Sequence, residues 1–375
     1  MTDKVAFLAE GQFIYWRSII IAAAALTALL AAVAVRLWQK KSLVALLIAL
    51  PVAIIFSVMC ARFIDWYCRF ESYESFGAAM STLTGGGYSL IGVFIGTILA
   101  CCLVRLLRVT DDLPALLDCL SPAAALGVAV GRFSELFSAA DRGKFLVENP
   151  SLQRLPIGSA VTNTVSGAVE WRFATFCAQA IWCALLLLIL AVYWAVVRRR
   201  KSGDVFLLFM LLYCLGQILL DSTRYDALFL RANGFVSLEQ IVCAVTVAAI
   251  IALWSVKSIR TGGFRSSLVL LWVLALLGLG LAGGAEWFVQ RKRDQFALAY
   301  SAMSLGLFMV FTAGTLLKRS ARRAEISPPE TPDMDPHTEG DHDAEQLETL
   351  SGGAAQDLPG EHGGFLQDGG PGPGR

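Results

Sequence analysis

The chain has 375 residues, of which 56% are hydrophobic and only 16% are charged, and its formal net charge is +1. Soluble domains carry about a quarter charged residues and fewer apolar ones, so this composition excludes an ordinary soluble protein and indicates several membrane spans. The nine cysteines form no CxxC pair. Most lie in or beside apolar runs, which predicts buried structural thiols and argues against a metal site or a disulfide framework.

Apolar runs near twenty residues long are sufficient to cross a bilayer as helices, and the runs found here do not alternate in polarity as barrel strands do. They cover about 18–35, 43–63, 88–107, 114–133, 173–197, 205–221, 237–256, 267–288 and 296–317. We therefore predict an all-α integral membrane protein. Its polytopic helical bundle would have a seven-span core within 1–260 and an extra C-terminal hairpin of two spans within 261–323.

Lysine and arginine in alternate short loops predict the orientation of the bundle. These residues gather at 36–41, 105–108, 198–201, 257–265 and 318–323. We expect these segments on the cytoplasmic side, which places the N-terminus outside and the C-terminal tail in the cytoplasm. The basic cluster at 291–293 would then lie outside, against the rule.

Three segments differ from the apolar runs. Residues 64–87 mix aromatic and acidic side chains and end in three glycines, and residues 134–172 predict a small extracytoplasmic head whose composition allows local helix. Residues 324–375 are acidic, rich in proline and glycine, and predict a disordered tail because they offer almost nothing to bury. All three histidines lie in this tail. Proton transfer in the membrane part would therefore need a carboxylate, a thiol, a tyrosine or the substrate.

The stretch GRFSELFSAADRGK, residues 131–144, places Arg132 and Glu135 where the fourth span leaves the bilayer. Ionised side chains are costly in hydrocarbon, so these two are functional candidates. They lie one turn apart and could pair. The alternative interpretation is an ordinary helix end whose arginine reaches the lipid phosphates. Asp118 lies 14 residues earlier, roughly 21 Å along a helix, and cannot be their partner.

Charged residues at the outer ends of the second, fourth and sixth spans are expected at similar depth. They are Arg62, Arg132, Glu135, Asp221 and Arg224. Converging arginines suit an anionic lipid phosphate, which a guanidinium binds with two hydrogen bonds. The alternative is a set of structural ion pairs that tie helix ends together. The spaced glycines of GGGYSLIGVFIG allow either close helix contact or a lipid chain lying against the backbone.

Taken together, these stretches resemble the prolipoprotein diacylglyceryl transferase family over about residues 10–260. LLDCLSPAAALGVAVGRF is similar to the family's Asp, Pro and Gly-Arg pattern, and GGYSLIGVFIG resembles its glycine-rich third span. YCLGQILLDSTRYDALFLRANGFVSLEQIV resembles its late motif. The matching residues are Asp118, Pro122, Gly131, Arg132, Tyr213, Asp221, Arg224, Asp226, Ser237 and Gln240.

Several polar positions depart from the family pattern. Glu135 stands where the family usually has asparagine, and Leu90 or Ile91 replaces a histidine. Gln179 replaces a glutamate, and Gln217 replaces an arginine of the late motif.

The resemblance implies a bacterial plasma-membrane transferase. It would move a diacylglyceryl group from phosphatidylglycerol to the lipobox cysteine thiol of a prolipoprotein signal peptide. The cysteine thiolate attacks the glyceryl carbon and glycerol phosphate leaves, so the site needs a base or a positive field and cations at the leaving group. The implied partners are phosphatidylglycerol, signal peptides and membrane lipid, with no nucleic acid, metal or cofactor.

We assign catalysis to Glu135, as the base, and to Arg132. Arg132 and Arg224 would bind phosphate, with Asp221 holding Arg224, and Glu135 could instead neutralise Arg132. The remaining candidate substrate-binding residues are Arg62, Gly86, Gly87 and Gln240. One alternative function is a catalytically inactive relative that binds phospholipid or a membrane partner. Another is a small transporter, but its polar groups would line a path at mid-membrane and those seen here lie toward the outer ends.

Overall fold

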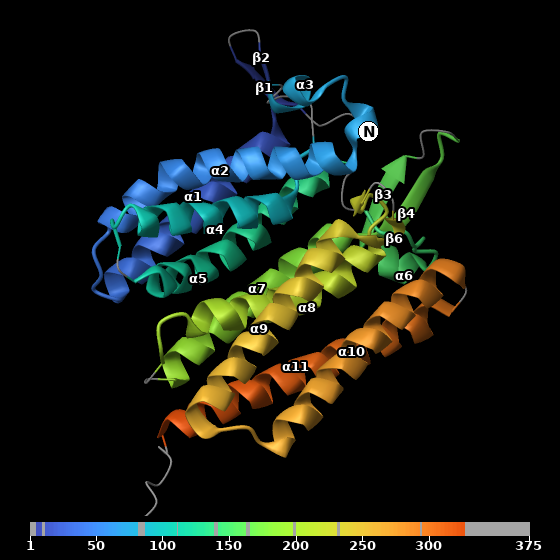
Figure 1. Ribbon diagram of the computed structural model, residues 1–375. Helices are drawn as coiled ribbons and strands as arrows, with labels where there is room; N and C mark the ends of the chain where they lie inside the picture. The colour runs from blue at the N-terminus through green and yellow to red at the C-terminus, as the bar shows by residue number, and fades with distance from the viewer. Residues whose placement is uncertain are drawn as a thin grey trace, which may run out of the picture. The chain divides into compact units, whose positions relative to one another are not determined.

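The computed structural model describes residues 5–9, 12–81, 87–110, 112–138, 142–162, 166–197, 200–230, 233–292 and 295–326 (Figure 1). Within these residues, each of the nine predicted spans is a helix. The helices are α1 (Trp16–Trp38), α2 (Val44–Cys68), α4 (Leu90–Leu106), α5 (Leu113–Gly131), α7 (Thr175–Val196), α8 (Asp204–Thr223), α9 (Leu238–Gly262), α10 (Ser266–Arg291) and α11 (Phe296–Ile326).

The polytopic helical fold is confirmed. In the described parts of the chain, eight helices are long and apolar enough to cross a membrane, and α4 is a shorter apolar helix of 17 residues. The last helix, α11, continues to Ile326, slightly past the predicted start of the tail. The rest of the predicted tail, from Ser327, lies outside the described residues.

Short non-helical elements that the sequence did not predict surround one end of the helices (Figure 1). Three antiparallel hairpins form from β1 (Val5–Ala9) and β2 (Gln12–Tyr15), β3 (Gly158–Thr162) and β4 (Val169–Phe173), and β5 (Phe229–Leu230) and β6 (Asn233–Ser237). The predicted head contains the β3–β4 hairpin and the short helix α6 (Pro150–Gln153). Two further short helices, η1 (Phe70–Ser72) and α3 (Phe76–Ser81), follow α2.

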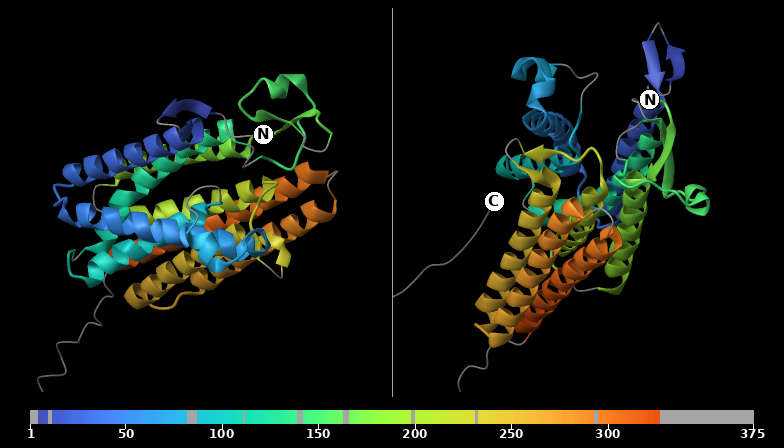
Figure 2. Two further views of the ribbon diagram at one scale, coloured as in Figure 1. Left: turned by 90° about the horizontal axis from the view of Figure 1, so that it is seen from above. Right: turned by 90° about the vertical axis from the view of Figure 1, so that its right-hand side faces the viewer.

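The helices pack in adjacent pairs: α1 on α5, α2 on α4, α5 on α7, and α8 on α9. The hairpin α10–α11 lies along α9, as the views in Figure 2 show. Its residues Met303, Val310 and Leu317 are completely buried in the main apolar core together with Leu211 and Val247. The two helices beyond the predicted seven-span core are therefore built into the bundle.

Glycines bring α2 and α4 into close contact. A Cβ atom at position 96 would lie 2.5 Å from the carbonyl carbon of Phe56, and one at position 92 would overlap the backbone of Ala61. Neither neighbour is a side chain that could turn away. Of the two roles that the spaced glycines allow, the structure shows close helix contact, the usual reason for small residues between membrane helices.

Replacing Gly92 with alanine is therefore expected to destabilise the protein by about 1–3 kcal/mol, since the added methyl group forces the two backbones apart. Gly280 in α10 is the matched control, because a Cβ atom there would meet nothing within 4 Å. Thermal unfolding of both variants in detergent measures the difference. Equal midpoints for the Gly92 variant and the parent would contradict the close-contact interpretation.

Asp118 lies in the first half of α5 and caps the N-terminus of α8. Its two carboxylate oxygens accept hydrogen bonds from the backbone N–H groups of Gly203 and Phe206, both at 2.7 Å. A carboxylate is favourable at a helix N-terminus because it satisfies free N–H groups and the helix dipole. The prediction that Asp118 and Arg132 serve different ends of the fourth span is confirmed.

Candidate functional site

The signature stretch forms a folded corner at the end of α5. The 3-10 helix η2 (Arg132–Phe137) continues directly from α5, and Arg142 is buried against it. The Arg142 guanidinium donates hydrogen bonds to the carbonyl oxygens of Glu135 and Ser138, both at 2.9 Å, and lies over the ring of Phe176. Arg142 therefore fixes the corner that carries Arg132 and Glu135.

Glu135 is 6% exposed and faces α1. Its Oε1 atom lies 3.4 Å from a guanidinium nitrogen of Arg17, at the start of α1. Arg17 was not predicted to take part, because nothing in the local sequence connects it with a residue 118 positions later. The structure thus brings a buried carboxylate and a cation together beside the corner.

Tyr213 of α8 carries a buried hydroxyl group. Its side chain is 4% exposed, and its hydroxyl has no hydrogen-bond partner among the described residues. Buried hydroxyl groups are nearly always hydrogen-bonded, so such a group calls for an explanation. The sequence identified Tyr213 as part of a motif but gave it no role.

Arg224 lies at the centre of three carboxylates. Its guanidinium is 3.1 Å from Asp221, 3.2 Å from Glu239 and 3.4 Å from Asp226. The predicted contact between Asp221 and Arg224 is confirmed. Because three negative groups surround one positive group, Arg224 is neutralised within the protein and holds the carboxylates in place.

Gln240 joins the same cluster through the start of α9. Its Oε1 atom accepts a hydrogen bond from the Ser237 backbone N–H at 3.1 Å, and the Ser237 hydroxyl accepts one from the Gln240 backbone N–H. This is a capping box. The Nε2 group donates to the Ile218 carbonyl at 3.2 Å and to Glu286 at 3.1 Å. The Gln240 amide therefore binds the protein at both of its polar atoms.

Arg62 and Gly87 meet in a separate set of contacts at the end of α2. The Arg62 guanidinium donates to the carbonyl oxygens of Ala79 at 2.7 Å and Gly87 at 3.0 Å. A Cβ atom at position 87 would overlap the carboxylate of Asp65, which accepts a hydrogen bond from Tyr73. Burial and that hydrogen bond raise the pKa of Tyr73 above its ordinary value. These contacts hold the segment that follows α2 against that helix.

Gly86, the remaining predicted substrate-binding residue, lies outside the described residues.

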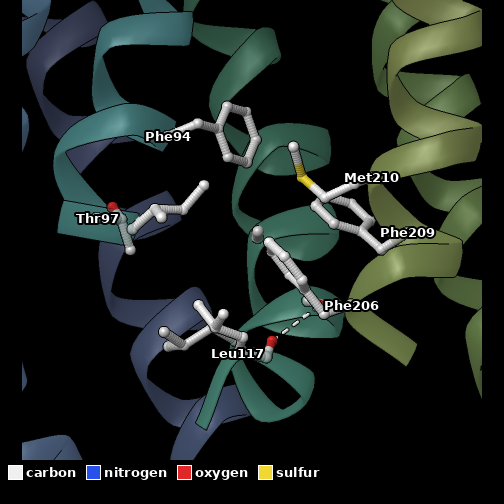
Figure 3. A pocket seen from close by; sticks show the side chains of 10 residues that line it. Phe94, Thr97, Leu117, Phe206, Phe209 and Met210 are labelled. Atoms are coloured by element: carbon white, nitrogen blue, oxygen red, sulfur yellow. Dashed lines mark hydrogen bonds between the residues drawn. The ribbon is translucent and has the colours of Figure 1, made fainter. Parts of the chain in front are cut away.

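An apolar pocket opens between α4, α5 and α8 (Figure 3). Phe94, Phe209, Met210 and Leu117 point into it, and most of the side chains that line it are apolar. The hydroxyl of Thr97 bonds the Val93 carbonyl of its own helix, and the hydroxyl of Ser121 does the same with Leu117. The pocket lies beside Tyr213, because the centroids of the Phe94 and Phe209 rings lie 4.9 Å and 5.6 Å from the centroid of the Tyr213 ring.

A sequence model of the family described as prolipoprotein diacylglyceryl transferase matches residues 4–256. The chain belongs to this family. Two individual members of the family are similar to this chain at 29% and 26% identity. The phosphatidylglycerol–prolipoprotein diacylglyceryl transferase of Parasynechococcus marenigrum (strain WH8102) is 29% identical over 256 residues, which are 64% of this chain and 89% of that protein. The enzyme of the same name from Bacillus velezensis is 26% identical over 259 residues, 67% of this chain and 90% of that protein.

Two departures from the prolipoprotein diacylglyceryl transferase pattern lie against each other. Gln179 of α7 donates a hydrogen bond to Gln217 of α8 at 2.5 Å, and both side chains are 1% exposed. The resemblance places a glutamate at the first position and an arginine at the second. A neutral buried amide pair therefore occupies the two positions at which the resemblance places opposite charges. Because 38 positions separate the two glutamines in the sequence, their spacing does not show that they are in contact.

Proposed function

We propose that this chain is a phosphatidylglycerol–prolipoprotein diacylglyceryl transferase of the bacterial plasma membrane, with its N-terminus outside and its tail in the cytoplasm. The sulfur of a lipobox cysteine attacks the glyceryl carbon of phosphatidylglycerol that bears the phosphate. A C–S bond forms as the C–O bond breaks, glycerol phosphate leaves with the bonding electron pair, and the thiol proton passes to a base. The products are a thioether-linked diacylglyceryl group and free glycerol phosphate.

The continuity of the polar and apolar regions at Tyr213 carries this proposal. The buried hydroxyl of this tyrosine has no hydrogen-bond partner among the described residues, and its ring packs against Phe94 and Phe209, which line the apolar pocket. An anionic phospholipid has the same division between a charged headgroup and an apolar chain. The headgroup would lie toward Arg132, and an acyl chain would lie against the apolar side chains around Phe94, since the cavity of about 30 Å³ is too small to enclose it (Figure 3).

Within this arrangement Arg132 supplies the positive charge for the phosphate, since a guanidinium matches phosphate geometry. Arg224 is surrounded by carboxylates, so it is not assigned to the phosphate as the sequence suggested. Instead, it holds Asp221, Asp226 and Glu239 in place. Carboxylate oxygens accept hydrogen bonds from hydroxyl groups, which suits the glycerol of the headgroup. Glu135 remains the proposed base for the thiol.

Tyrosine 213 offers a test that separates function from folding. Replacing Tyr213 with phenylalanine removes a buried hydroxyl without a described partner, so the stability should stay equal or rise by about 1 kcal/mol. If the hydroxyl binds the headgroup, lipid transfer should nevertheless fall by about tenfold or more. Thermal unfolding and a lipidation assay on the same preparation give both values. Unchanged transfer would remove Tyr213 from the site.

A second candidate function is phospholipid binding without transfer. The neutral Gln179–Gln217 pair favours this second function, because the family pattern that the chain resembles has a charged residue at each of the two positions. Such a protein would keep Arg132 and the pocket but would not modify a cysteine. Binding of phosphatidylglycerol by the purified protein together with no modified lipoprotein would support this alternative.

Complementation of a transferase-depleted bacterium distinguishes the two functions. The full-length chain is expressed in the depleted strain, and a reporter lipoprotein is recovered and weighed by mass spectrometry. We expect growth and a reporter whose mass has increased by one diacylglyceryl group. A reporter that stays unmodified, although the chain is present in the membrane, would contradict the proposed transfer.

A further inference from the structure

We propose that Glu286 of α10 is a positioning residue for the candidate headgroup site. Through it the hairpin α10–α11, which lies beyond the family match at 4–256, becomes part of that site. The inference rests on the proposed function, since the headgroup is taken to be that of phosphatidylglycerol. It extends that function to a segment that the family relationship does not cover.

Glu286 is a buried carboxyl group in a membrane helix, with 4% of its surface exposed. Its two oxygens accept hydrogen bonds from the side chains of Gln240 and Gln290, both at 3.1 Å. Gln290 also donates to the carbonyl oxygen of Phe235, in the β6 strand that leads into α9. Glu286 is therefore bonded directly to the first turn of α9 through Gln240, and Gln290 connects it to the strand that precedes α9.

From Gln240 an unbroken series of contacts reaches Arg224. Gln240 and Ser237 form the capping box, and the Ser237 hydroxyl donates to one carboxylate oxygen of Asp221. The other oxygen of Asp221 contacts Arg224 at 3.1 Å. Arg224 in turn contacts Glu239, which neighbours Gln240 on the first turn of α9. Glu286 thus holds the helix start that presents Glu239 to Arg224.

Docking of the hairpin does not explain this carboxyl group. At the other end of α11, Arg322 contacts Asp204 of α8 at 2.6 Å, and between the two ends Met303 and Leu317 are buried in the apolar core. A buried carboxyl group is costly, and an apolar residue of similar size usually stabilises packing at least as well. The position of Glu286 beside Gln240 is thus better explained by a need to orient the polar site.

The test compares binding of phosphatidylglycerol to full-length variants in detergent, followed by native mass spectrometry, with phosphatidylcholine as the reference lipid. Replacing Glu286 with leucine keeps volume but removes both acceptors, and should weaken phosphatidylglycerol binding by about tenfold. The conservative change Glu286→Gln keeps an acceptor for Gln240 and should stay within about threefold of the parent. Gln240→Ala breaks the same contact from the other side, and serves if the leucine variant does not fold.

Arg322→Ala is the matched control, because it weakens the hairpin at its far end and leaves the Glu286 contacts intact. It should lower the thermal midpoint while keeping the lipid affinity. Equal losses of affinity in the Arg322 and Glu286 variants would show that only docking matters and would overturn the inference. So would parental affinity in Glu286→Leu and Gln240→Ala when Arg132→Ala has lost binding. If Arg132→Ala itself binds normally, the headgroup site is wrong, and the role of Glu286 fails with it.

Discussion

Replacing Arg132 with alanine is expected to lower diacylglyceryl transfer by about a hundred- to a thousandfold, the usual cost of removing a group that stabilises developing negative charge. Arg132 begins η2, at the corner that Arg142 fixes through the carbonyl oxygen of Glu135. Lysine at position 132 should retain part of the activity, because it keeps the charge and loses the two-pronged geometry. The measurement is the initial rate of lipidation of a reporter lipoprotein.

Arg105→Ala is the control for this experiment. It removes an arginine from the exposed end of α4, where the guanidinium contacts the Thr110 carbonyl. We expect parental transfer rates for it. The phosphate role of Arg132 is excluded if Arg132→Ala transfers lipid as fast as Arg105→Ala at equal amounts of folded protein.

The Gln179–Gln217 pair leads to the largest expected effect on stability. Arginine at position 217 alone would bury a charge against a neutral amide, which should destabilise the protein by about 3–5 kcal/mol. Glutamate at position 179 should compensate when both changes are combined, because the two side chains already touch at 2.5 Å. Unfolding of both single variants and the double variant in one detergent gives the coupling energy.

This cycle also bears on how the chain departed from the family pattern. If the double variant is more stable than the sum of the two single effects predicts, the two positions are energetically coupled. Such coupling would show that they change as a unit. If the effects simply add, the amide pair is not the counterpart of an ion pair. Gly280→Ala, in open space on α10, provides a control for handling and detergent.

The helices could be predicted from the sequence because each span is an apolar run long enough to cross a bilayer. The hairpins could not, since strands such as GSAVT and VEWRF span only five residues, and the alternation of apolar and polar side chains in VEWRF is absent from its partner GSAVT. Even the positions of the helix ends differ locally. For example, α2 continues to Cys68, into the segment predicted to follow the second span.

The site was predictable only where contacts are local. Asp221 and Arg224 are three residues apart, so helical spacing identified their contact, and the Ser-x-x-Gln spacing of Ser237 and Gln240 matches a capping box. The contact of Glu286 with Gln240 joins residues 46 positions apart. Similarly, no local pattern shows that Tyr213, one of many large apolar or aromatic residues in α8, has a buried hydroxyl without a hydrogen-bond partner among the described residues. Helix rotation and packing decide both.

The most direct test of the central claim uses the purified full-length protein in vesicles that contain phosphatidylglycerol. A synthetic peptide with a lipobox cysteine is added and then analysed by mass spectrometry, with phosphatidylcholine vesicles and a Cys→Ser peptide as controls. We predict a thioether-linked diacylglyceryl adduct on the cysteine peptide and release of glycerol phosphate in equal amount, only with phosphatidylglycerol. An unmodified peptide in the presence of folded protein that binds phosphatidylglycerol would contradict transfer and leave a lipid-binding member of the family.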